Sequence, residues 1–200
     1  MGYVAVIDYG AGNLMSVTNA LEYIGAQSVI TADKGVIARA DRIILPGVGA
    51  FPAAMDNLEK AGLVQVLCRE SENKPFLGIC LGMQMLFDRS FEIRQCAGLG
   101  LIPGEVRKIE TALKLPHIGW NSLEFRNPCP ILEGIDEGAY VYFVHTFCAV
   151  PENEENLIAT ADYGEHVAGI VARGNVIGCQ FHPEKSGETG LKMLKNFCAM

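Results

Sequence analysis

The chain is 200 residues long, half of them hydrophobic and 20% charged, with a formal net charge of −7. A chain of this size forms one large domain or two small ones, and it buries enough apolar surface to fold without metal or disulfide staples. Its negative charge and the absence of any basic run argue against a nucleic-acid or anionic-membrane partner.

The first half of the chain alternates short apolar runs with helical patterns. Four buried strands and three helices are predicted there, the strands at residues 3–8, 28–32, 42–45 and 76–80 and the helices at residues 13–24, 51–59 and 63–72. Strands separated by helices imply right-handed crossovers and a mainly parallel sheet with helices on both faces. The predicted fold class is therefore α/β.

The second half changes to short strands joined by polar turns. Six strands are predicted, at residues 106–109, 122–125, 140–150, 157–163, 167–173 and 176–181. The tripeptide Arg173–Gly174–Asn175 is typical of a hairpin turn, and residues 187–200 predict a closing helix. Because there is no internal repeat or domain-scale linker, we expect one domain over residues 1–200, with extra antiparallel strands in this half.

Parallel sheets bind ligands outside the carboxyl ends of their strands. In this chain that rule selects four turns, at residues 9–13, 46–51, 78–82 and 181–184. Candidate catalytic residues are expected in these turns.

The strongest local signal is Gly78–Ile79–Cys80–Leu81–Gly82, between an apolar strand and a helical run at residues 83–88. It is the cysteine form of a nucleophile elbow, a turn so tight that glycines are favoured two residues either side of the nucleophile. The turn leaves the Leu81 N–H free at a helix N-terminus, where a thiolate and a developing oxyanion are both stabilised. The alternative is a buried cysteine in a glycine-rich turn.

A second signal, His182–Pro183–Glu184, ends the apolar run at residues 176–181. Proline favours extended geometry in the residue before it, so positions 182 and 184 tend to face the same side. A carboxylate beside an imidazole fixes its tautomer and stabilises the imidazolium that forms when it takes a thiol proton. The alternative is a pair that only caps a strand end, but a cysteine elbow in the same sheet favours catalysis.

The third signal is Pro46–Gly47–Val48–Gly49, directly after the strand predicted at residues 42–45. Acyl transfer needs a second N–H donor for the oxyanion, and a glycine loop at a neighbouring strand end can supply it. Loss of one such donor typically costs ~3–4 kcal/mol of transition-state stabilisation. A plain turn is an equally good interpretation of this segment alone.

One further glycine motif, Gly10–Ala11–Gly12–Asn13, is similar to a dinucleotide-binding loop. Met15 stands where the third glycine should be, and Asp33 could serve as the ribose ligand. Without its third glycine the fingerprint is incomplete, so dinucleotide binding is discounted.

The seven cysteines are scattered, and no two form a Cys-x-x-Cys pair. Neither a zinc site nor a dithiol redox motif is indicated, so we expect no metal and no cofactor. Residues 1–8 lack basic residues and break their apolar run at Asp8, unlike a signal peptide, and no segment has the apolar length of a membrane span. A reducing cytoplasm is the expected compartment.

Together these motifs resemble those of the triad-type class I glutamine amidotransferases, over nearly the whole chain. The likeness continues from the elbow to Met83 and Gln84, and from His182 and Glu184 to Lys185 and Ser186. Within that class, four segments are similar to the glutaminase subunits of imidazole glycerol phosphate synthases, which act in histidine biosynthesis: residues 8–14, 46–51, 117–121 and 142–147. The resemblance implies a flavodoxin-like fold and hydrolysis of L-glutamine to glutamate and ammonia.

The resemblance also implies a mechanism. His182 deprotonates Cys80, the thiolate attacks the side-chain amide of glutamine, and water later hydrolyses the thioester. The oxyanion is held by Leu81 N–H and by the loop Gly47–Val48–Gly49. By position, Gln84 and Glu92 match family residues that bind the amino-acid end of glutamine. The backbone of Thr146 and Phe147 matches the position that contacts its α-carboxylate.

The partner in this family is a (β/α)₈-barrel cyclase subunit, which implies a heterodimer. Ammonia free in water mostly becomes ammonium, which has no lone pair, so channelling between subunits makes chemical sense. Five residues match positions near that interface: Asn13, Trp120, Tyr142, His145 and Lys185. For Trp120 and Tyr142 a buried aromatic cluster is the alternative. The family's oxyanion loop is often unready until the partner's ligand binds, and Val48 is where we expect its peptide to turn.

Three other interpretations remain open from the sequence. The chain could be the glutaminase of another synthase, such as that for anthranilate or pyridoxal phosphate, although those subunits carry different loop and interface segments. It could be a binding module on the same fold that has lost the reaction, against which the intact Cys80, His182 and Glu184 argue. A cysteine peptidase or chaperone is disfavoured by Gln84 and by the absence of an evident peptide-binding insertion.

Overall fold

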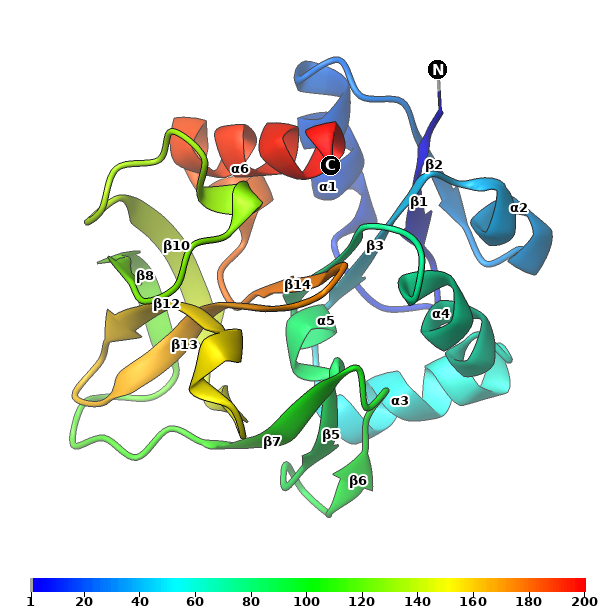
Figure 1. Cartoon of the computed structure of the whole chain (residues 1–200). Coiled ribbons are helices and arrows are strands. Elements are labelled where there is room, and N and C mark those ends of the chain that lie inside the picture. Colours follow the sequence, from blue (N-terminus) through cyan, green and yellow to red (C-terminus); the bar gives the residue numbers. More distant parts are fainter. Residues whose placement is uncertain (1) are drawn as a thin grey trace.

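An eight-stranded sheet forms the centre of the molecule (Figure 1). The computed structural model describes residues 2–200. Neighbouring strands run parallel in the order β2 (Ser28–Thr31), β1 (Val4–Ile7), β3 (Arg42–Gly47), β4 (Phe76–Cys80) and β14 (Val176–Cys179). Three antiparallel strands extend the sheet, namely β13 (His166–Arg173), β12 (Leu157–Asp162) and β9 (Glu124–Phe125). The predicted α/β class, with antiparallel strands from the second half, is confirmed.

Helices cover both faces of the parallel part. One face carries α2 (Lys34–Arg39), α3 (Phe51–Lys60) and α4 (Val64–Ser71), and the other carries α1 (Leu14–Tyr23) and α6 (Gly187–Ala199). The side chains of β1 alternate between these layers, because Ala5 and Ile7 join the first core and Val4 and Val6 the second. A strand buried on both faces is necessarily a continuous apolar run, as β1 is.

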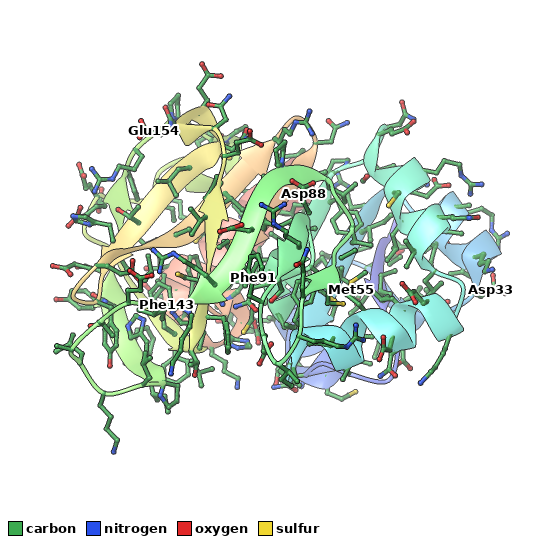
Figure 2. The ribbon with its side chains drawn as sticks, turned by 90° about the horizontal axis from the view of Figure 1, so that it is seen from below. Asp33, Met55, Asp88, Phe91, Phe143 and Glu154 are labelled. Atoms are coloured by element: carbon green, nitrogen blue, oxygen red, sulfur yellow. The ribbon has the colours of Figure 1, made fainter. Side chains whose placement is uncertain are left out.

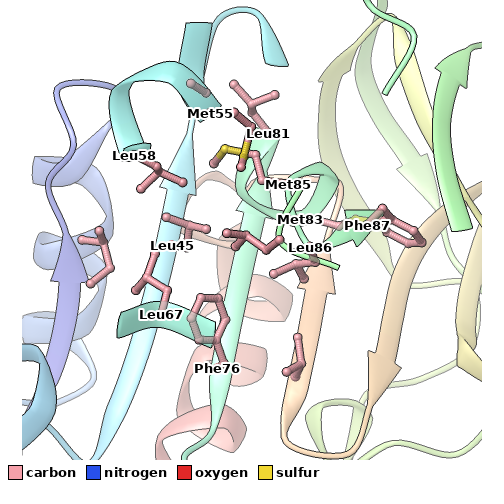
Figure 3. Packing of buried hydrophobic residues seen from close by; sticks show 14 of the residues in the cluster. Leu45, Met55, Leu58, Leu67, Phe76, Leu81, Met83, Met85, Leu86 and Phe87 are labelled. Carbon is pink, nitrogen blue, oxygen red and sulfur yellow. The ribbon is translucent and has the colours of Figure 1, made fainter. Parts of the chain in front are cut away.

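The core on the side of α3 and α4 consists of large aliphatic and aromatic side chains (Figure 3). Leu45 of β3 and Phe76 of β4 share this core with Leu58 of α3 and Leu67 of α4, and all four are fully buried. Burial of each such side chain stabilises the fold by about 2–3 kcal/mol. This packing holds β3 and β4 together just before the turns predicted to be catalytic.

Two smaller sheets lie beside the central one. An antiparallel ribbon contains β8 (His117–Ser122) and β10 (Tyr140–His145). A four-stranded sheet has the order β11 (Phe147–Pro151), β7 (Ile102–Lys108), β5 (Phe87–Ser90) and β6 (Cys96–Ala97). Three single turns of 3₁₀ helix complete the regular structure, namely η1 (Pro130–Leu132), η2 (Glu154–Asn156) and η3 (Pro183–Lys185). Because β10 runs almost directly into β11, residues 145–147 join the two smaller sheets.

The predicted hairpin at residues 173–175 is confirmed, since β13 and β14 pair antiparallel and Gly174 has a φ of +57°. The helical run predicted at residues 83–88 is wrong. The helix there is the single turn α5 (Leu81–Gln84), and β5 begins at Phe87. Met85, Leu86 and Phe87 are all fully buried, and the periodicity of so short an apolar run does not separate helix from strand. Pairing of β5 with β7, which lies farther along the chain, decides the outcome.

The single strand predicted at residues 140–150 is two strands, because β10 pairs with β8 and β11 pairs with β7. The sequence prediction missed β8 and α2. At α2, Asp33 is the N-cap, and its carboxylate accepts a 2.8 Å hydrogen bond from Val36 N–H. Figure 2 places Asp33 at the opposite end of the molecule from Phe143 of β10. No helix within residues 2–200 is long and apolar enough to cross a membrane.

Candidate active site

The turns after β3, β4 and β14 meet at one cavity of about 350 Å³. Val48 and Gly49 follow β3, Cys80 ends β4, and His182 follows β14, and all four line this cavity. Three of the four turns selected from the sequence therefore contribute directly to a single site. The fourth turn, after β1, supports it through Tyr9, which contacts the base of the loop after β3.

Cys80 stands at the sharpest turn of the site. Its φ is +56° and its ψ is −112°, a backbone conformation that residues other than glycine rarely adopt. The residue is 7% exposed, lines the cavity and is followed at once by α5. A strained residue between a strand and a helix is the geometry of a nucleophile elbow.

The two glycines of the elbow are required by close packing. A Cβ on Gly78 would lie 2.6 Å from the carbonyl oxygen of Gly82, and a Cβ on Gly82 would lie 1.8 Å from the carbonyl oxygen of Leu45. In both cases the obstacle is backbone, which cannot move aside as a flexible side chain can. The motif of glycines two residues either side of Cys80 thus lets β3, β4 and α5 come together.

His182 and Glu184 form a buried pair on the other side of the cavity. Nδ1 of His182 lies 2.8 Å from Oε1 of Glu184, and both side chains are almost completely buried. Because a carboxylate only accepts hydrogen bonds, Nδ1 carries the proton and Nε2 remains for Cys80. Glu184 Oε2 is buried with no hydrogen-bond partner among residues 2–200, so the carboxylate is held through Oε1 alone.

The charge of this pair sets the protonation of the imidazole. Burial lowers the pKa of His182, but its interactions with Cys80 and Glu184 outweigh burial and raise the pKa to about 9. A histidine in this state retains a proton taken from a thiol at neutral pH. The arrangement therefore favours an imidazolium beside the Cys80 sulfur.

Ser186 fixes the backbone of His182 against β10. Its hydroxyl donates to the His182 carbonyl oxygen at 2.6 Å and accepts from Tyr142 N–H at 3.0 Å. The His182 N–H in turn donates to the Tyr142 carbonyl oxygen at 3.0 Å. Ser186 belongs to the motif that follows Glu184, but the sequence alone indicated no role for its side chain.

The predicted oxyanion loop at residues 47–49 has two different parts. Gly47 is buried at the end of β3, where a Cβ would lie 2.7 Å from the Tyr9 hydroxyl and 2.8 Å from Gly82 N. Tyr9 donates a 3.0 Å hydrogen bond to the Pro46 carbonyl oxygen. Val48 is 46% exposed, and Gly49 has a φ of +97° with open space around it. The base of the loop is therefore closely packed, whereas its tip has few contacts.

The four predicted substrate-binding residues all line the cavity. Gln84 is buried and donates from Nε2 to the Phe147 carbonyl oxygen at 3.0 Å. Glu92 accepts a 2.7 Å hydrogen bond from Phe51 N–H, at the start of α3. The Thr146 carbonyl oxygen accepts from Ile109 N–H. A carboxylate, an amide and the backbone of residues 146 and 147 therefore border one cavity.

His145, expected near a partner interface, is 6% exposed and lies in the floor of the cavity. Its Nδ1 donates to the Phe147 carbonyl oxygen at 2.8 Å, and its Nε2 lies 3.0 Å from Nδ1 of His117. Burial lowers the pKa of both histidines to about 4. Since both rings stay neutral at physiological pH, they form a fixed hydrogen-bond chain that supports residue 147.

The other predicted interface residues lie at or near the surface. Trp120 is 55% exposed, and its ring packs edge-on against Tyr142 at a centroid distance of 6.0 Å. Lys185 is exposed, and Asn13 is the N-cap of α1, where its side chain accepts from Ser16 N–H. An exposed Trp120 does not fit the alternative of a buried core cluster.

Sequence reasoning assigned no side-chain role to four residues that the structure brings into the site: Tyr9, His117, Gln180 and Ser186. For Gln180 there was a signal, since it is a polar residue inside the apolar run that ends at Phe181. His117 lies in the family-like segment 117–121, but its role could not be predicted, because its partner His145 is brought to it only by the pairing of β8 with β10.

Comparison with known proteins supports the resemblance to class I glutamine amidotransferases that the sequence motifs indicated. The profile of the family described as glutamine amidotransferase class-I matches residues 5–200. The chain is 54% identical over 196 residues to the imidazole glycerol phosphate synthase subunit HisH of Bacillus cereus, covering 97% of this chain and 93% of the relative. The protein of the same name from Bacillus anthracis is 52% identical over 195 residues, with the same coverage.

Solved structures share the fold at lower identity. PurLQS from Thermotoga maritima superposes with a TM-score of 0.78 at 22% identity, covering 100% of this chain and 99% of that one. A glutamine amidotransferase from the same organism gives a TM-score of 0.66 at 16% identity, covering 99% of this chain and 83% of that one. At such identities the likeness concerns the fold.

Proposed function

Because the chain belongs to the glutamine amidotransferase class-I family, we propose that Cys80, His182 and Glu184 are the catalytic triad with which it hydrolyses L-glutamine. The chain is the glutaminase subunit of an imidazole glycerol phosphate synthase and acts in histidine biosynthesis. The observation that carries the assignment of the triad is the buried His182–Glu184 pair, which shares one cavity with a strained cysteine elbow.

Acylation follows from the geometry of the triad. His182 Nε2 takes the proton of Cys80, and the buried Glu184 carboxylate stabilises the resulting imidazolium through Nδ1. The thiolate then attacks the side-chain carbonyl carbon of glutamine. His182 returns the proton to the leaving nitrogen, ammonia departs, and water hydrolyses the glutamyl thioester with His182 again acting as base.

The oxyanion of each tetrahedral intermediate needs preorganised N–H donors. Leu81 N–H lies at the start of α5, and Val48 and Gly49 border the same cavity, with Gly47 buried at the base of their loop. We assign the oxyanion hole to these groups. One such donor contributes ~3–4 kcal/mol to the transition state, so the position of the loop controls the rate.

The amino-acid end of glutamine is assigned to the mouth of the cavity. The Glu92 carboxylate is suited to the ammonium group, and the Gln84 amide has both N–H bonds engaged, which leaves its oxygen as an acceptor. The backbone of Thr146 and Phe147 is assigned to the α-carboxylate. The Cys80 sulfur borders the same cavity, and we assign the side-chain amide of glutamine to it.

The ammonia passes to a partner cyclase, and we propose that this partner is a (β/α)₈ barrel. The docking surface that we propose includes Trp120 and Lys185, together with Tyr142 and Asn13 beside them. We also propose that the pair works in the cytoplasm, since all seven cysteines are unpaired, as expected in a reducing compartment.

The test is ammonia release from glutamine by the purified chain, alone and together with a barrel cyclase and the nucleotide ligand of that cyclase. We expect release that rises at least tenfold when both are present. Release that ignores the cyclase would contradict the proposed partner but keep the triad. No release under any condition would contradict the proposed function itself.

A further inference from the structure

Gln180 is a fully buried polar side chain beside the nucleophile. It directly follows β14, is 0% exposed, and its backbone N–H donates to the Gly169 carbonyl oxygen at 2.9 Å. Its side chain lies between two residues of the site. Oε1 accepts a 3.0 Å hydrogen bond from Gln84, and Nε2 lies 3.9 Å from the Cys80 sulfur, within hydrogen-bond range for sulfur.

The orientation of the Gln180 amide is determined by its neighbours. The Phe147 carbonyl oxygen only accepts, so the Gln84 group that faces it at 3.0 Å is the NH₂ group. The second N–H of that NH₂ group faces Gln180, which must therefore present Oε1 to it. The Gln180 NH₂ group is left pointing at Cys80.

The polar neighbours of the Cys80 sulfur differ in which form of the sulfur they favour. The Val144 carbonyl oxygen lies 3.9 Å away and accepts from the thiol S–H. Once that proton has moved to Nε2 of His182, the carbonyl faces a thiolate and offers it no hydrogen. The Gln180 N–H is a donor, so it favours the thiolate over the thiol.

We propose that Gln180 is a further catalytic residue: its side-chain N–H stabilises the Cys80 thiolate while its Oε1 holds Gln84 with the amide oxygen toward the substrate. The inference rests on the proposed glutaminase function. It assigns a different role to each end of the Gln180 side-chain amide. The N–H end acts on the rate of attack, and the oxygen end acts on substrate binding through Gln84.

The experiment measures alkylation of Cys80 by iodoacetamide across pH, without glutamine, and follows the Cys80 peptide by mass spectrometry because other cysteines are partly exposed. In Gln180→Leu we expect the pH of half-maximal alkylation to rise by about one unit, the size expected when a thiolate loses one hydrogen bond. With the cyclase partner, kcat should fall about tenfold and KM for glutamine should rise. Cys179→Ala, a cavity-forming change one residue earlier in the core that also contains Cys80, removes no hydrogen-bond donor to the sulfur and should leave the alkylation profile unchanged.

Gln180→Glu serves as a second variant, since it keeps the volume and an acceptor for Gln84 but removes the donor. We expect its alkylation profile to move up by at least as much as that of Gln180→Leu. Folded variants with the parent profile would overturn the role of Gln180, whatever their kcat. If the parent chain alkylates normally but hydrolyses no glutamine with its partner, the proposed function fails and the shift in alkylation still decides the role of Gln180.

Discussion

The triad and the tip of the oxyanion loop lie around the same cavity, yet the protein holds them in opposite ways. Cys80 and His182 are 7% and 3% exposed, and the close approach of Gly78 and Gly82 and the hydrogen bonds of Ser186 fix their backbones. Val48 is 46% exposed, and Gly49 has open space around it.

This difference in burial corresponds to a difference in proposed role, because the buried residues would react and the exposed loop tip would regulate the rate. A nucleophile and its base must stay aligned in every turnover, so it is favourable to bury them in the sheet. A donor that turns into place only when needed requires a segment with few contacts. On the proposed mechanism, the triad would stay complete while the rate depended on a few loop residues with few contacts.

The largest expected effect on glutamine hydrolysis is at Cys80, one of the buried residues. Cys80→Ala removes the nucleophile, so glutamine hydrolysis in the presence of the cyclase should fall by about 10⁴-fold or more. The fold and partner binding should be retained, because the buried side chain becomes smaller by one atom. The measurements are ammonia release, circular dichroism and titration with the partner. A variant that still hydrolyses glutamine would remove Cys80 from its role.

Glu184→Gln should cost less, because Glu184 orients the imidazole and does not attack. We expect a loss roughly a hundredfold smaller than that of Cys80→Ala. Glu184 also helps to raise the pKa of His182 to about 9, so its loss lowers that pKa. The fall in rate on the alkaline side should then move from near pH 9 to lower pH in a profile of kcat/KM. Equal losses for the two variants would contradict the division between attack and orientation.

Two glycine variants compare the base of the oxyanion loop with its tip. In Gly47→Ala the new Cβ meets the Tyr9 hydroxyl, Gly82 N and the Leu81 Cβ at 3.0 Å or less. We expect at least a tenfold loss of kcat and about 2 kcal/mol less stability against urea, as for overpacking. In Gly49→Ala nothing lies within 4 Å, and only the φ of +97° opposes the change. That variant should lose activity only a few-fold and about 1 kcal/mol of stability, which is less than Gly47→Ala loses; equal effects would mean that the tip is as fixed as the base.

The last prediction concerns stability alone and tests the buried histidines beside the site. The pKa of His145 is lowered from 6.5 to about 4 in the folded state. Between pH 6.5 and pH 4 this histidine is therefore protonated in the unfolded chain but neutral in the folded protein. Stability should therefore decrease as pH falls from 6.5 to 4, by about 3 kcal/mol for this group. His145→Gln, which keeps a donor for the Phe147 carbonyl oxygen, should reduce that slope. His166→Gln, which removes a histidine at an exposed site, is the matched control.

The sequence by itself determined the local parts of this protein. The parallel strands, the elbow around Cys80 and the motif of His182 and Glu184 were predicted because their signals depend on residues close together in the chain. Glycines at positions 78 and 82 are needed for one tight turn, and proline at 183 restricts the residue beside it. Such constraints are visible without knowing the rest of the fold.

The features that depend on residues far apart in the chain were decided only by the tertiary structure. Met85, Leu86 and Phe87 fit helix or strand equally, and the pairing of β5 with β7 chose the strand. Residues 140–150 divide into two strands because they pair with different partners. Gln180 contacts Gln84 across 96 positions, and His117 meets His145 across 28. These hydrogen bonds exist because sheet pairing and burial bring their donors and acceptors together, and no pattern in neighbouring residues encodes them.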